Sequence, residues 1–267
     1  MNRLFGALRQ PPTPMASRLY GVFFVVLVLG VWFLATLGAA EERFVSPAVM
    51  PSPAEVFGSL PSLINERGLF DSIAASLLRV LQGFGLAIVI GVPLGFAAAS
   101  WQALHRFLTP AVIFGSNVPV AALVGLTMMW FGLGEAQKVM FIFIASVPFV
   151  FSCAAAALIA IPQRYVETAQ TLGASSGQIV LKVLVPLALP EVFTSLRSLF
   201  GLAFGYIMLA EVIDAKHGLG YLINISQRRG ALDHIFLVLI VIALLAFAID
   251  RLLLVLQRGL FSYRTDA

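Results

Sequence analysis

The chain has 267 residues, of which 60% are hydrophobic and 11% charged, whereas a soluble domain carries about 25% charged residues. A mean hydropathy of +0.97 exceeds what one water-solvated core can hold, so we expect lipid to cover much of the chain. A net charge of +4 without a basic block, and a single cysteine, Cys153, exclude a nucleic-acid partner, an intrachain disulfide and a cysteine-rich metal site.

Six stretches are long and apolar enough to cross a bilayer, since a hydrocarbon core about 30 Å thick needs about 20 apolar residues in a helix. No alternating pattern of the β-barrel type occurs, so the fold class predicted is an all-α membrane protein with six transmembrane helices. The predicted spans are Leu19–Ala40, Val80–Ala99, Phe107–Phe131, Val139–Ile161, Val192–Ala210 and Ile235–Leu256.

The first span follows a leader that contains Arg3, Arg9 and Arg18, which is loosely the outline of a secretory signal. Its apolar run exceeds the roughly 7–15 residues of a signal's core, so a retained helix is favoured over a cleaved signal. With the N-terminus inside, eight of the 17 lysines and arginines lie on inner segments and six on outer ones, which favours two cytoplasmic termini. The expected parts are a cytoplasmic leader (1–18), a transmembrane domain (19–256) and a cytoplasmic tail (257–267).

The outer connection after the first span contains a helix start signal. Ser52-Pro53-Ala54-Glu55 has the spacing of a capping box with proline at the first helical position, which predicts a short outer helix.

Reactive groups are conspicuously few. No glycine is followed by lysine, so the chain has no Walker A loop, and His105, His217 and His234 are isolated. Gly218-Leu219-Gly220 lacks the third glycine of a dinucleotide loop and reads as a turn. We therefore expect no catalytic residue, no cofactor and no metal, and regard the chain as a non-enzyme.

Polar residues inside the spans are candidates for a transport pathway. Ser116 and Asn117, just before Pro119, either line such a pathway or form a structural kink in the third span. Arg197 is the charge well inside a span, which requires an acidic partner such as Glu191 or another acid, or an anion in a wet pathway.

Charges nearer the span ends have a more ordinary explanation. Arg79 either attracts an anion or extends its side chain to the headgroups, and Asp250 and Arg251 are expected to do the latter. The spacings Gly91-x-x-x-Gly95 and Gly201-x-x-x-Gly205 permit close helix approach, within one chain in preference to between two copies.

The segment after the fourth span predicts a short amphipathic helix outside the membrane. Pro162 is placed to start it, Tyr165, Ala169 and Leu172 share one face, and Gly173 is placed to end it. Such a helix either lies on the headgroups or docks a cytoplasmic partner.

Here the sequence resembles a known family. Glu167-Thr168-Ala169, Gly173 and then Val183-Leu184-Val185-Pro186 resemble the EAA loop of ABC importer permeases, although Thr168, Val183 and Val185 replace the usual residues. Segments similar to the nitrate, sulfonate and taurine subgroup are Ser76–Phe84, Gly91–Gly95, Trp130–Gly134 and Glu211 with Gly218–Gly220, whereas Gly125 stands where that subgroup usually has a proline.

The resemblance implies a type I ABC importer permease fold in the bacterial inner membrane, with a cytoplasmic coupling helix in the loop 162–186. The implied partners are cytoplasmic ABC ATPase subunits, a second permease copy, a periplasmic or lipid-anchored solute-binding protein and membrane lipid. The implied cargo is a small anion such as nitrate or a taurine-like sulfonate, with a pyrimidine-type vitamin precursor as the alternative. The coupling residues would be Tyr165, Glu167, Ala169, Leu172, Gly173 and Pro186, and the pathway residues Ser116, Asn117 and Arg197.

Two other classes of protein compete with this interpretation. An ion-coupled secondary carrier would place acids or histidines in mid-membrane, and the three histidines lie outside the span centres. A membrane-embedded scaffold would show no ATP-dependent uptake.

Overall fold

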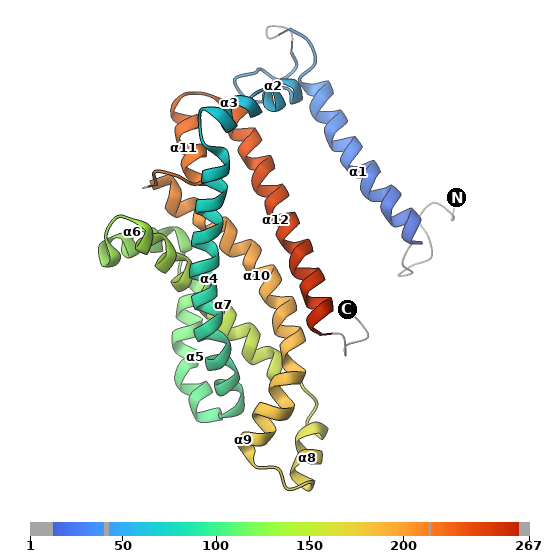
Figure 1. The fold of residues 1–267 in the computed structure, drawn as a ribbon, viewed down its shortest axis with the longest axis vertical. Coiled ribbons are helices and arrows are strands. Elements are labelled where there is room, and N and C mark those ends of the chain that lie inside the picture. Colours follow the sequence, from blue (N-terminus) through green and yellow to red (C-terminus); the bar gives the residue numbers. More distant parts are fainter. Residues whose placement is uncertain (1–12, 40–42, 214, 262–267) are drawn as a thin grey trace.

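The structure is a computed structural model that describes residues 13–39, 43–213 and 215–261, and the regular structure in these residues is helical. Long helices form a bundle, with α2, α3 and α11 at one end and α8 and α9 at the other (Figure 1); we call these the α11 end and the α8 end. The helices are α1 (Pro14–Ala35), α2 (Pro53–Gly58), α3 (Leu60–Asn65), α4 (Leu69–Ser100), α5 (Gln102–Asn117), α6 (Val120–Phe131), α7 (Glu135–Ile159), α8 (Arg164–Thr171), α9 (Ser176–Ile179), the π-helix η1 (Val180–Leu184), α10 (Val185–Ile213), α11 (Leu219–Arg228) and α12 (Leu232–Leu260).

Five helical segments in the described residues are long and apolar enough to cross a membrane, and the bent pair α5–α6 makes a sixth if it counts as one span. The predicted third span is wrong in shape, because α5 and α6 meet at 105°. Val118, which precedes Pro119, is extended (φ −68°, ψ 129°), since the proline ring disfavours helical backbone at the preceding residue.

Helices α4 and α7 pack closely along their length because glycines line the contact. A Cβ on Gly83 would lie 2.6 Å from the carbonyl oxygen of Val139, and one on Gly95 would lie 2.6 Å from that of Phe151. Internal packing is therefore confirmed for Gly91-x-x-x-Gly95. It is wrong for Gly201-x-x-x-Gly205, where a Cβ at either glycine would meet no atom of the described residues within 4 Å.

The predicted short helix after the first span is α2, and its capping box is present: Ser52 and Glu55 each accept a backbone N–H of the other. The Arg43 guanidinium binds Glu55 at 2.9 Å and holds the pKa of that carboxyl down to about 2. α1 diverges from α12 toward its N-terminal end (Figure 1), and Trp32 near its other end donates to the carbonyl oxygen of Pro51 at 2.9 Å.

Candidate functional site

The predicted helix of the inner loop is α8, which projects beyond the bundle (Figure 1). Gly173 ends it as predicted, with φ +79°, and two backbone bonds close the terminus. The Gly173 N–H donates to the Gln170 carbonyl at 2.9 Å, and the Ala174 N–H donates to the Ala169 carbonyl at 3.0 Å. This is a Schellman motif, in which a glycine in the left-handed region turns the chain sharply away from the helix.

The face predicted for α8 is only partly buried. Ala169 is 8% exposed, Tyr165 39% and Leu172 83%. The three residues have the predicted helical spacing, but of the three only Ala169 is buried. Leu172 is the C-cap residue, where the chain already leaves the helix. Glu167 is exposed in the first turn, where a carboxylate favours the positive end of the helix dipole.

Ala169 attaches α8 to the bundle. It belongs to an apolar cluster with Phe96 of α4, Ala154 and Leu158 of α7, and Ala188 of α10. The chain returns to the bundle through α9 and η1, and Pro186 is the second residue of α10. The five predicted coupling residues from 165 to 173 therefore lie together, with Pro186 at the start of the next long helix.

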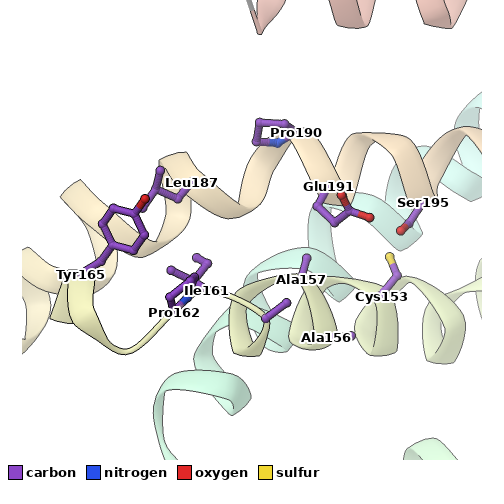
Figure 2. Close-up of a pocket in the computed structure, with 11 residues that line it drawn as sticks. Cys153, Ala156, Ala157, Ile161, Pro162, Tyr165, Leu187, Pro190, Glu191 and Ser195 are labelled. Carbon is purple, nitrogen blue, oxygen red and sulfur yellow. The ribbon is translucent and has the colours of Figure 1, made fainter. Parts of the chain in front are cut away.

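A cavity of about 590 Å³ opens between the α8 end of α7 and the start of α10. Figure 2 shows Cys153 on α7, Tyr165 on α8, and Leu187, Glu191 and Ser195 on α10 around this space. Most of the remaining lining is alanine and proline. In the described residues, no group of three His, Cys, Asp or Glu side chains could hold a metal ion.

Arg197 lies in α10 and pairs with α12. Its guanidinium donates to Asp250 at 2.8 Å and to Gln257 at 3.0 Å. The acid that meets Arg197 is therefore Asp250 rather than Glu191, and the expectation that Asp250 extends to the headgroups is wrong. The pair satisfies an intramembrane charge with a protein partner, which removes the need for a bound anion at Arg197.

Ser116 and Asn117 lie at the end of α5, at the bend. The Ser116 hydroxyl donates to the Val112 carbonyl at 2.9 Å, and the Asn117 amide donates to the Ile113 carbonyl at 2.8 Å. Both side chains bond back to carbonyls one turn earlier in the same helix, a pattern that often bends helices, and Asn117 is exposed. The geometry therefore favours the structural kink over a pathway lining.

A charged cluster at the α11 end was missed by sequence reasoning. Arg79 is 5% exposed, and it donates to Glu211 and to Glu135, each at 2.7 Å. It therefore neither reaches the headgroups nor stands free for an anion. The available signal was that Arg79, Glu135 and Glu211 are charges at the same end of three predicted spans, where apolar surroundings favour pairing.

The glycines of Gly218-Leu219-Gly220 belong to this cluster. The Gly220 N–H donates to Glu211 at 2.9 Å, and a Cβ on Gly218 (φ +138°) would lie 2.5 Å from the Glu211 carboxyl carbon. The prediction of a turn holds for Gly218, which lies between α10 and α11, but Leu219 and Gly220 are already the first residues of α11. Both glycines are required because the backbone passes close to the buried Glu211 carboxylate.

The structure is a bundle of membrane-length helices with a short helix, α8, beyond one end. Residues 91–262 match the family described as "Binding-protein-dependent transport system inner membrane component". The chain belongs to this family, and it is an ABC permease component that is not itself an ATPase.

Two named relatives match almost the whole chain, and a third matches about three quarters of it. It is 32% identical to the taurine transport system permease protein TauC of Escherichia coli over 97% of this chain and 94% of the relative. It is 25% identical to the putative aliphatic sulfonates transport permease protein SsuC of Bacillus subtilis over 97% and 92%. It is 31% identical to the bicarbonate transport system permease protein CmpB of Synechococcus elongatus over 72% and 70%.

Solved structures share the fold. The inward-facing MetNI methionine ABC transporter matches with a TM-score of 0.63 at 22% identity, over 73% of this chain and 98% of the other. A bacterial alginate ABC transporter matches with a TM-score of 0.54 at 15% identity, over 95% and 98%.

Proposed function

We propose that this permease forms the pathway for a small anion, with a taurine-like sulfonate as the main expectation and nitrate as the neighbouring one. Three similar permeases are named for taurine, aliphatic sulfonates and bicarbonate. Each of these solutes contains a negatively charged sulfonate or carboxylate-like group. A second copy of the chain, two ABC ATPase subunits and a solute-binding protein would complete the transporter. A family of binding-protein-dependent permeases supports the last two partners.

The single observation that carries the coupling role is the placement of α8. The helix projects from the end of the bundle (Figure 1), with Glu167 and Leu172 exposed and Ala169 buried against three long helices. The exposed side of α8 can therefore enter a groove on a partner, and the buried Ala169 can transmit a displacement of α8 to the long helices. We place the α8 end, and with it both termini, on the cytoplasmic side of the bacterial inner membrane.

Affinity capture of the cognate ABC ATPase in detergent tests this role. Gly173→Trp forces a bulky side chain into φ +79° and should abolish capture, because the Schellman turn sets the angle at which the chain leaves α8. Gly58→Trp is the matched control. A Cβ at Gly58 also meets open space, but this residue lies in α2, at the opposite end of the bundle from α8 (Figure 1). Equal capture by both variants would contradict docking through α8.

Uptake into proteoliposomes then tests the cargo. With ATPase and solute-binding protein present, taurine should accumulate in an ATP-dependent manner, and competition by nitrate and bicarbonate ranks the anions. Uptake of a neutral pyrimidine in preference to every anion would overturn the anion assignment.

A further inference from the structure

The guanidinium of Arg79 is buried with a partner for each of its three nitrogens, and the coupling role does not use this cluster. Arg79 Nη1 donates to Glu211 and to the carbonyl oxygen of His217, both at 2.7 Å. The other side of the guanidinium holds both oxygens of Glu135. The planar guanidinium group of Arg79 thus contacts the start of α7, the end of α10 and the loop before α11.

Glu211 is held equally firmly from its other side. Its side chain is fully buried and accepts from the Ser76 hydroxyl at 2.7 Å and from the Gly220 N–H at 2.9 Å. The Ser76 oxygen in turn accepts the Leu219 N–H at 2.9 Å. The first residues of α11 are therefore fixed by side chains of α4 and α10.

The same three long helices meet again at the α8 end. Phe96 of α4, Leu158 of α7 and Ala188 of α10 lie in the apolar cluster that holds Ala169 of the coupling helix. α10 has 29 residues and spans about 43 Å at 1.5 Å per residue. A displacement of α8 thus reaches helices whose far ends are joined through Arg79.

The two junctions differ in kind. Apolar packing has no preferred direction, whereas a guanidinium bound to two carboxylates and a carbonyl has fixed geometry. We propose that Arg79 is a positioning residue of the transport cycle: it fastens α11 to α4, α7 and α10, so that the α11 end moves as one unit with the coupling loop. This inference rests on the proposed coupling function.

A distance measurement tests the fastening directly in the full chain. In a Cys153→Ala background, spin labels at Phe70→Cys on α4 and Gln227→Cys on α11 occupy exposed positions. Double electron–electron resonance in nanodiscs should give one narrow distance. Arg79→Gln should lose that single distance and give a broad distribution, at temperatures where the protein remains folded by circular dichroism.

A matched variant separates positioning from general destabilisation. Arg197→Gln removes the other intramembrane arginine pair, whose partners lie on α12, and should leave the α4–α11 distance narrow. The proposal is overturned if Arg79→Gln keeps the narrow distance, or if Arg197→Gln broadens it as much.

An uptake assay tests the same variant independently of the distance measurement. The Arg79→Gln permease should still capture its ATPase, and that ATPase should retain basal ATP hydrolysis. The assembled transporter should lose ATP-dependent taurine uptake. Unimpaired uptake would overturn the positioning role. If wild-type protein itself captures no ATPase, the proposed coupling function fails, while the distance result still reports whether Arg79 fastens α11.

Discussion

At the scale of single residues, some features follow from sequence spacing over a few positions, and others depend on residues far away in the chain. The capping box at Ser52 and the turn at Gly173 depend on neighbours within a few positions, so spacing alone predicts them. The partners of Arg79 and Arg197 lie 132 and 53 residues away. Sequence shows that such charges need partners, but the packing of distant helices decides which ones they meet.

Gly218 provides the sharpest residue-scale prediction. Gly218→Ala should lower the free energy of unfolding in an SDS titration by about 2 kcal/mol or more, because the new methyl group collides with the Glu211 carboxylate and φ +138° is strained. Gly125→Ala is the control: its Cβ meets open space within α6, and alanine favours a helix by about 1 kcal/mol. A smaller loss for Gly218→Ala than for Gly125→Ala would contradict this account of the cluster.

At the scale of elements, composition predicts which segments are apolar helices but not their shape. Phe107–Phe131 contains no charged residue, and its mean hydropathy contains no information about the direction of the helix axis. The 105° bend follows from Pro119, which keeps Val118 extended, and Ser116 and Asn117 bond back to carbonyls of α5 beside it. Glycine spacing likewise predicts that two helices can approach closely, while only the fold shows that Gly95 has a neighbour and Gly201 has none within the described chain.

This difference between two identical motifs predicts opposite outcomes for one substitution. Gly95→Val should lower the unfolding midpoint by more than about 5 °C, since the carbonyl oxygen of Phe151 would lie 2.6 Å from the new Cβ and backbone cannot move aside. Gly201→Val should leave the midpoint unchanged in fluorescence-detected size-exclusion chromatography after heating. Equal destabilisation would mean that α10 has close neighbours on its Gly201 face.

At the scale of the whole molecule, the arrangement separates two tasks. The α8 end presents an exposed helix held by apolar contacts, and the α11 end joins the same long helices through a satisfied set of charges. This division predicts a definite orientation in the membrane, because an ATP-driven partner is available only on the cytoplasmic side.

Cysteine accessibility in cells that express the permease alone checks this orientation. In a Cys153→Ala background, Gln227→Cys on α11 should react with a membrane-impermeant maleimide in spheroplasts. Leu172→Cys, at a side chain that is 83% exposed, should react only after the membrane is permeabilised. Both positions are accessible in the structure, so a difference in labelling reports the side of the membrane rather than burial. Labelling of Leu172→Cys in intact spheroplasts would place α8 outside, where no ATPase could reach it, and the coupling role would be wrong.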